Sequence, residues 1–295
     1  MKVKKAGGAV LVASLCAAAF AAYGSSLSTA ATTKSVPSVA ALVPASVKAK
    51  GTITVAADAS YAPNEFFASD GHTVIGMDAD LAKALAGVMG LKANVVNATF
   101  ATIIPGLASG KYDMGASSFT DTKAREKVVD FVDYFLAGTS FFTKAQGGTS
   151  VMGLSGLCGK SVAVETGTTE LSDAQAQSKK CTSAGKAKVN VLSFNTQSDA
   201  NLALSSGRAQ LSMADSPVAA YQVKQSHGKF KITGHTYGTA PYGLALPKHN
   251  GMAKAVKAAL LVLYKNGTYT KILKKWGITS GALPISKVKI NGATS

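Results

Sequence analysis

The chain has 295 residues, of which 47% are hydrophobic and 16% are charged, so it has the composition of a globular protein and the length of two ordinary domains. This composition excludes a disordered or fibrous chain. The formal net charge of +16 would suit a nucleic acid or an anionic surface, but the lysines are scattered and are not interleaved with aromatic residues. We therefore expect a solvated basic surface and no nucleic-acid partner.

The first 22 residues have the pattern of a secretory signal peptide. Three lysines precede an alanine-rich apolar stretch at 6–22, and residues 19–21 offer a small-residue cleavage site. The sequence therefore predicts an exported protein, either periplasmic or at the cell surface. Two alternatives stay open: a lipid on Cys16, against which Leu15 stands where a lipoprotein signal needs a small residue, and an uncleaved anchor.

Residues 23–51 are rich in Ser, Thr, Ala, Val and Pro, a composition that predicts a flexible leader or tether without a core. From residue 52 onward, β-rich runs alternate with segments of helical periodicity. The expected elements are a strand at 52–57, a helix at 76–91 with Asp78 as its cap, a strand at 94–97 and a helix at 103–109. This order predicts a parallel sheet flanked by helices.

A second series of the same kind follows a break at Gly147 and Gly148. Strands are expected at 160–165, 189–194 and 210–214, each followed by a helix, and the chain then returns through 232–246 to a helix at 252–266. We therefore predict an α/β protein with two lobes, each a mainly parallel sheet flanked by helices. Lobe 1 is expected to comprise 52–140 and 236–295, lobe 2 to comprise 141–235, and the two crossings to form a two-stranded hinge.

Residues 117–131 (SSFTDTKAREKVVDF) place hydroxyls and one arginine in front of an expected amphipathic helix. Together with residues 100–116 (FATIIPGLASGKYDMGA), and with the ending at 267–277 (GTYTKILKKWG), the segment resembles the polar amino-acid group of bacterial solute-binding proteins, the extracytoplasmic receptors of ABC importers. The resemblance implies a type II periplasmic-binding-protein fold that closes around a polar L-amino acid. It also implies a membrane permease as partner, a monomeric receptor, and no cofactor or metal.

The resemblance assigns ligand contacts in the first lobe. Arg125 stands where the family binds the ligand's α-carboxylate, and its guanidinium can offer two parallel donors. Ser118 and Thr120 match positions that contact the ligand's backbone. The alternatives are an exposed arginine paired with Asp121 and ordinary turn or capping hydroxyls.

The second lobe is expected to contribute a helix start and one acid. Thr168 and Thr169 follow Gly167 at the start of a predicted helix, where free N–H groups favour an anion. Asp215 ends a predicted strand and matches the family's acceptor for the ligand's ammonium group. The alternative reading makes these residues helix caps, and Pro217 supports it for Asp215.

Aromatic and acidic residues are expected around the ligand's side chain. Tyr61 and Phe100 match positions that sandwich it, although either could be plain core. Asp58 would contact its distal end, with Glu65 assisting, which weakly favours lysine, arginine or glutamine. Asn64 departs from the bulky apolar residue that is usual in the family after the proline.

If Cys16 leaves with the signal, Cys158 and Cys181 form an even pair in an exported chain, so we predict a disulfide. Closing a loop of about 22 residues would contribute roughly 3 kcal/mol in chain-entropy models. The alternative is two buried free thiols.

Two other functional classes are weighed against the receptor. Some exported dehydratases resemble these receptors, but the four histidines are dispersed and no metal-ligand spacing or Gly-x-Ser-x-Gly motif occurs, so an enzyme is not expected. A sensor subunit that does not feed transport would need the same closed, liganded form and stays an alternative.

Overall fold

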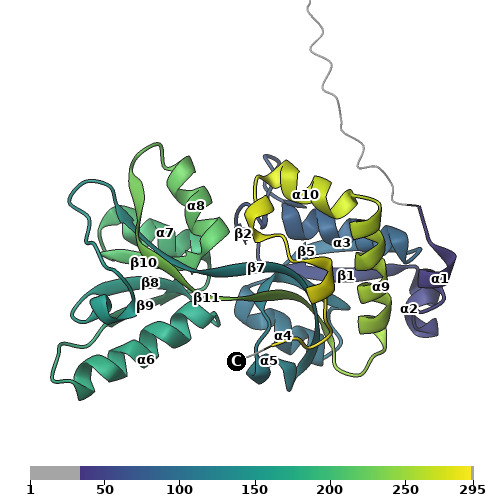
Figure 1. Ribbon diagram of the computed structural model, residues 1–295, viewed down its shortest axis with the longest axis horizontal. Helices are drawn as coiled ribbons and strands as arrows, with labels where there is room; N and C mark the ends of the chain where they lie inside the picture. Colours follow the sequence, from purple (N-terminus) through teal and green to yellow (C-terminus); the bar gives the residue numbers. More distant parts are fainter. Residues whose placement is uncertain (1–33, 294–295) are drawn as a thin grey trace, which may run out of the picture. The chain divides into compact units, whose positions relative to one another are not determined.

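A computed structural model of the protein describes residues 34–293, and the predictions made for the signal peptide and for Cys16 lie outside them. This part of the chain builds an eight-stranded sheet of order β5-β1-β6-β11-β7-β10-β8-β9 and a small antiparallel sheet, β2-β3-β4 (Figure 1). The strands of the large sheet are β1 (Thr52–Ala57), β5 (Lys92–Asn97), β6 (Met114–Thr120), β7 (Val129–Lys144), β8 (Ser161–Glu165), β9 (Asn190–Phe194), β10 (Leu211–Asp215) and β11 (Phe230–Pro247). The small sheet comprises β2 (Ser60–Tyr61), β3 (Glu65–Phe67) and β4 (Val74–Ile75).

The long strands β7 and β11 pair antiparallel at the centre and connect the two lobes. On the first-lobe side, β1 runs parallel to both β5 and β6, and on the second-lobe side β8 runs parallel to both β9 and β10. The predicted α/β fold class is confirmed, but the two mainly parallel halves are joined through β7 and β11 into one continuous sheet and do not form the two separate sheets that were expected. Because both expected crossings fall inside continuous strands, the lobe boundaries at 140/141 and 235/236 stay a prediction.

Helices cover both faces of the first-lobe sheet. On one face, α3 (Met77–Val88), α9 (Met252–Lys265) and α10 (Thr268–Trp276) share a core in which Leu81 and Leu260 are fully buried. On the other face, α4 (Phe100–Ala108) packs its Ile103 in a cluster with residues of β6, β7 and β11. The end of the sheet beside α4 is where the candidate site forms.

The second lobe has the same layering. Helix α6 (Thr169–Ser183) packs Ala174 into a cluster with β8 and β10, whereas α7 (Gln197–Ser206) packs alanines against the other face. Helix α8 (Ser216–Gln225) follows β10 directly and buries Val218. The expected strands and helices of this lobe are therefore present, with ends shifted by a few residues.

The prediction of a flexible tether at 23–51 was wrong for the residues that the structure describes. Helices α1 (Pro37–Ala40) and α2 (Ala45–Lys50) pack against the first lobe. The reason is burial: Val39 of α1, Val43 of the turn between the helices and Val47 of α2 recur every four residues and are all buried in the core of this lobe. Average composition hides such a spacing.

The amphipathic helix expected around Arg125 was also wrong in extent. Only one turn forms, α5 (Lys123–Glu126), capped by Thr122, whose Oγ1 accepts a hydrogen bond from the Arg125 N–H at 3.2 Å. Strand β7 begins three residues later, because Val129, Phe131 and their neighbours are β-branched or aromatic and are buried in the sheet.

The last described residues lie along β7 and behind the α5 turn. Ile290 forms an antiparallel bridge to Val132, and the Asn291 side chain accepts a hydrogen bond from the Phe131 N–H at 2.8 Å. The Ala293 N–H donates to Glu126 Oε1 at 3.0 Å. Two of the single-turn helices, η2 (Thr279–Gly281) and η3 (Ile285–Lys287), precede this segment; a third, η1 (Leu154–Leu157), lies in the second lobe.

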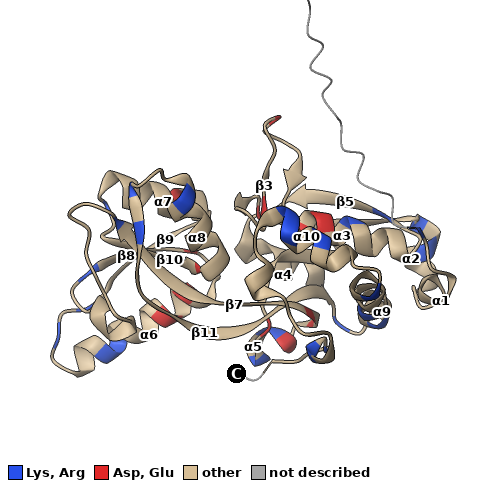
Figure 2. Ribbon diagram, turned by 45° about the horizontal axis from the view of Figure 1, so that its top comes forward, with Lys and Arg blue, Asp and Glu red and all other residues tan. Residues whose placement is uncertain are grey.

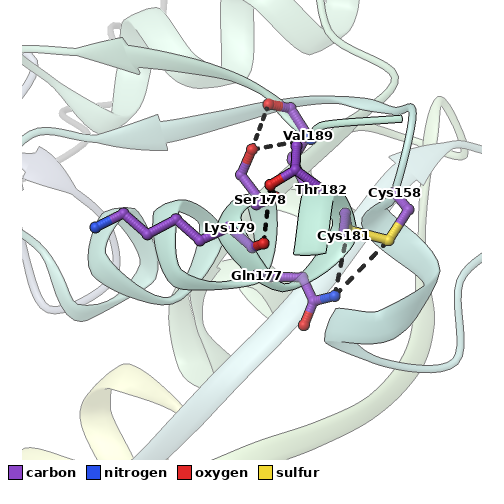
Figure 3. Close-up of a disulfide and its surroundings, with 7 residues drawn as sticks. All are labelled: Cys158, Gln177, Ser178, Lys179, Cys181, Thr182 and Val189. Carbon is purple, nitrogen blue, oxygen red and sulfur yellow. Dashed lines mark hydrogen bonds between the residues drawn. A yellow bond between two sulfur atoms is a disulfide. The ribbon is translucent and has the colours of Figure 1, made fainter. Parts of the chain in front are cut away.

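The disulfide between Cys158 and Cys181 is present, with an S–S distance of 2.01 Å, which confirms the predicted pairing (Figure 3). It joins the last turn of α6 to the residue after η1. The Gln177 side-chain amide lies 3.4 Å from the Cys181 sulfur, and Ser178 Oγ donates to the Val189 carbonyl at 3.2 Å. The far end of α6 is therefore fixed to the body of the second lobe.

Lysines and arginines are spread over helices of both lobes, including α6, α9 and α10 (Figure 2). This agrees with the solvated basic surface expected from the sequence. Within residues 34–293, no helix combines the length and apolarity needed to cross a membrane.

Candidate functional site

A cavity lies between the lobes, and every ligand-binding residue predicted from the sequence lines it. The lining comprises Asp58, Tyr61, Glu65, Phe100, Ser117, Ser118, Thr120, Arg125, Glu165, Thr168, Thr169, Glu170 and Asp215. The cavity has a free volume of about 10 Å³, which leaves room for roughly one water molecule. The side chains of the two lobes therefore meet across the site in a closed arrangement.

Ser118 sits at the floor of the cavity in a left-handed conformation, with φ of 52°. Its N–H donates to Asp78 Oδ2 at 2.7 Å, and Tyr134 OH donates to the other oxygen of Asp78 at 2.6 Å. Asp78 was expected to cap α3, but Gly76 holds the cap position and Asp78 is fully buried beneath Ser118. The strained backbone of Ser118 is thus held by a buried carboxyl, as is common at ligand sites.

Glu65 lies beside this buried pair. Its Oε1 accepts a hydrogen bond from Ser117 Oγ at 2.9 Å and its Oε2 one from Ser118 Oγ at 3.3 Å. Burial, followed by the neighbouring carboxyl of Asp78, raises the pKa of Glu65 well above its usual range. Both oxygens of Glu65 are therefore engaged within the first lobe.

Arg125 is aimed across the cavity mouth from the α5 turn. One guanidinium nitrogen donates to the Thr120 carbonyl at 2.8 Å, and the other donates to the Gly167 carbonyl of the second lobe at 3.0 Å. The guanidinium carbon lies 5.4 Å from the centroid of the Phe100 ring. Arg125 forms no ion pair with Asp121, although the structure describes both side chains, so that alternative was wrong.

The N-terminus of α6 faces the same space. Thr168 caps this helix: its Oγ1 accepts from the Leu171 N–H at 3.2 Å and donates to the Glu165 carbonyl at 2.7 Å. Thr169 Oγ1 donates to Glu170 Oε2 at 3.1 Å. The capping alternative therefore holds for Thr168, yet Thr168, Thr169 and Glu170 line the cavity, so the positive dipole end of α6 lies beside it.

Asp215 and Tyr61 meet across the two lobes. Tyr61 OH donates to Asp215 Oδ2 at 2.9 Å and accepts from the Asp215 N–H at 3.0 Å. Asp215 occupies the cap position of α8, but its side chain makes no cap hydrogen bond, so the capping alternative does not describe its carboxylate. Burial, and next the nearby Glu170, raise the pKa of Asp215 well above its usual range.

Asp58 is committed to local structure. Its Oδ2 accepts from the Phe100 N–H at 2.8 Å, and its Oδ1 accepts from Ser60 Oγ at 2.6 Å. Asp58 thereby caps α4 and positions Phe100, whose ring stacks on Phe119 with a centroid distance of 4.5 Å. The expected contact of Asp58 with the ligand stays a prediction.

The sequence analysis missed two acids of the second lobe. Glu170 Oε1 accepts from Thr139 Oγ1 of the hinge strand at 2.7 Å. Glu165 is only 2% exposed, and within the described chain its Oε1 has no hydrogen-bond partner. Glu165 ends a buried strand as Asp58 and Asp215 do, so the same strand-end rule would have found it.

Comparisons with known proteins agree with this geometry. Residues 53–279 match the family model of bacterial extracellular solute-binding proteins, family 3. The arginine-binding protein ArgT of Corynebacterium glutamicum is 36% identical over 249 residues, which cover 84% of this chain and 81% of that protein. The ABC transporter glutamine-binding protein GlnH of Bacillus subtilis is 30% identical, covering 68% of this chain and 72% of that protein.

A solved structure is similar as well. An ancestral arginine-binding protein bound to arginine superposes with a TM-score of 0.70 at 38% identity, covering 77% of this chain and 98% of that one. All three proteins are named for binding, which supports the expected receptor over the enzyme. The chain therefore belongs to the bacterial extracellular solute-binding proteins, family 3.

Proposed function

We propose that this protein captures L-arginine outside the cytoplasm by closing its lobes and delivers it to the membrane permease of an ABC importer. The observation that carries the proposal is the charge of the cavity lining, where five carboxyl side chains accompany one guanidinium. They are Asp58, Glu65, Glu165, Glu170 and Asp215. Because buried charge without a counter-charge is costly, this lining suits a ligand with more positive than negative groups. L-arginine has two cations and one carboxylate.

The groups common to all amino acids have matching partners. Arg125 can turn its two donors from the Gly167 and Thr120 carbonyls toward an α-carboxylate, and the N-terminus of α6 adds N–H donors. Asp215 would accept the ligand's ammonium group once Tyr61 releases it. Capture therefore exchanges contacts between the lobes for contacts to the ligand.

The aromatic residues suit a flat cation. Phe100 is held by its stack on Phe119, and the side chain of Tyr61 is 6% exposed. A planar guanidinium gains from lying against an aromatic face, whereas an aliphatic ammonium offers no plane to stack. This favours arginine over lysine.

The similar proteins support the same ligand and define the runner-up. One relative is named for arginine, and so is the ancestral structure, whereas the Bacillus relative is named for glutamine. A glutamine amide is neutral and would leave the additional carboxyls of the cavity without a counter-charge. Glutamine is therefore the second candidate.

Thermal unfolding of refolded, ligand-stripped protein tests the ligand class. A ligand that binds only the folded state raises the unfolding midpoint by mass action, so the rise at equal concentration ranks affinity. We expect the order arginine, lysine, glutamine, with no rise for glutamate. A larger rise with glutamine than with arginine would transfer the proposal to the runner-up.

Uptake measurements test transport separately. Cells that lack the gene are expected to lose uptake of labelled arginine at low concentration and to regain it with the wild-type gene. Uptake that is unchanged by the deletion, in a protein that binds arginine, would favour the sensor alternative.

A further inference from the structure

Four of the five carboxyl groups in the cavity already accept hydrogen bonds from other residues of the protein. Asp58 is held by Ser60 and by the Phe100 N–H, and Glu65 is held by two serines. Glu170 is held by Thr139 and Thr169, and Asp215 by Tyr61. Glu165 is different, because its Oε1 is buried and has no partner among residues 34–293.

The position of Glu165 is as informative as its missing partner. It ends β8 in the second lobe, two residues before Gly167, and its side chain lines the cavity. The carboxyl of Asp58, from the first lobe, lines the same cavity, and its charge contributes to the raised pKa of Glu165. When the lobes close, two acids from opposite lobes therefore line the same cavity.

We propose that Glu165, and not Asp58, receives the guanidinium of bound arginine and so determines the preference for a basic side chain. The inference rests on the proposed function, because Glu165 is assigned here as the residue that binds the distal end of L-arginine. Asp58 keeps a positioning role through the cap that it provides for α4.

The electrostatics of the closed form supply the selectivity. Burial, and next the carboxyl of Asp58, raise the pKa of Glu165 well above its usual range, which reflects the cost of a negative charge there. A guanidinium placed between the two acids removes that cost and gives Glu165 a charge-assisted partner. A neutral side chain of the same shape does neither, so it leaves the buried oxygen unsatisfied.

Citrulline is the sharpest probe of this idea, because it replaces the guanidinium of arginine with a neutral urea of nearly the same shape. The experiment measures the dissociation constants of L-arginine and L-citrulline by calorimetry for the wild type, Glu165→Gln, Asp58→Asn and Asp199→Asn. Asp199 is an exposed acid of the second lobe that does not line the cavity, so its variant is the matched control.

We expect the wild type to prefer arginine strongly, and Glu165→Gln to bind arginine about 10- to 100-fold more weakly while binding citrulline as before. Asp58→Asn should lower the affinities for arginine and citrulline to a similar extent, and Asp199→Asn should change neither affinity. Should the amide variant not fold, Glu165→Ala carries the same expectation.

The possible failures are distinct. If the wild type binds arginine tightly and Glu165→Gln keeps the full preference over citrulline, the role of Glu165 is overturned while the proposed function stands. If Asp58→Asn alone abolishes the preference, the assignment to Glu165 is likewise overturned. If the wild type does not prefer arginine to citrulline, both proposals fail together.

Discussion

The two lobes supply polar groups to the same cavity but prepare them differently. In the first lobe, Ser118 is fixed by Asp78 and Asp58 by the start of α4, both within that lobe, and Arg125 donates to the Thr120 carbonyl there and to the Gly167 carbonyl across the cavity. In the second lobe, Asp215 takes its side-chain hydrogen bond from Tyr61 of the other lobe, and Glu165 has a buried oxygen without a partner in the described part of the chain. The contrast suggests that the first lobe is a preformed half-site, whereas the second is completed by what it closes upon.

The largest expected effect comes from removing the cation of the preformed half. Arg125→Ala should lower the affinity for every amino acid by at least about 100-fold, because the α-carboxylate of the ligand loses two charge-assisted hydrogen-bond donors. Calorimetry measures the affinity, and thermal unfolding without ligand checks that the fold persists.

Arg208→Ala is a matched control for this change. Arg208 also lies over an aromatic ring, 5.5 Å from the centroid of Phe194, but it lines no part of the cavity. Its replacement should leave affinity unchanged. An equal loss in both variants would mean that Arg125 acts on stability and not on the ligand.

The second lobe contains a disulfide, and the described part of the first lobe contains none. Replacing both Cys158 and Cys181 with serine should lower the free energy of unfolding by about 3 kcal/mol, since the unfolded chain regains the entropy of the open loop. Denaturant unfolding measures the change. Arginine affinity at room temperature should stay within about twofold, and a large loss of affinity would show that the disulfide positions α6 for binding.

Gly167 sets how closely the lobes approach. It has φ of +85°, and a Cβ added there would lie 3.0 Å from the Ala101 Cβ of the opposite lobe. Gly167→Ala should therefore hinder closure of the lobes and lower the affinity for arginine by roughly tenfold, about 1.4 kcal/mol. Small-angle scattering with saturating arginine should show a more open form of the variant.

Gly185→Ala separates closure from backbone strain. Gly185 has a similar φ of +67°, but nothing lies within 4 Å of a Cβ added there. Its variant should lose stability without losing affinity. If both variants lower the affinity for arginine equally, the close approach of Gly167 to Ala101 does not limit closure of the lobes.

The smallest expected effect is the dependence of affinity on pH. Burial raises the pKa of Glu165 and of Asp215 in the closed, ligand-free form. These carboxyl groups therefore keep their protons at pH values above those at which a carboxyl group usually ionises. The cations of arginine favour the ionised carboxylates. Binding should therefore release protons, and affinity should rise with pH by at most about tenfold per unit of pH for each proton released.

Calorimetry in two buffers of different ionisation enthalpy measures this release directly. Asp58, Glu170 and Asp215 oppose the ionisation of Glu165, whereas Arg125 is the cation that lines the same cavity and favours it. Proton uptake on binding arginine would contradict the charge states inferred for the second lobe.

Much of the fold could be read from the sequence because its periodicities are strong. Strand β1 spans the predicted residues 52–57, and each βα unit of both lobes is present. The short helices α1 and α2 were missed because the three valines at a spacing of four lie in a segment rich in Ala, Ser and Pro, whose average composition is that of a tether. The α5 turn was extended too far because its polar residues continue directly into a buried strand.

The residues around the cavity were predictable where a motif or a strand end marked them, which covers Arg125, Thr168 and Asp215. How each carboxyl is occupied was not predictable, because it depends on partners distant in the chain. Asp58 is engaged by a helix start 42 residues away, whereas Glu165 is left with a free oxygen. That difference decides which acid is available to a ligand.

The last described residues have a consequence for the α5 turn. Ala293 and Lys248 both hold Glu126, the residue that follows Arg125, through hydrogen bonds to its side chain and to its carbonyl. Residues that line no part of the cavity thus brace the single turn that aims its guanidinium. Removing the contact of Ala293 with Glu126 should therefore weaken carboxylate binding, although Ala293 does not line the cavity.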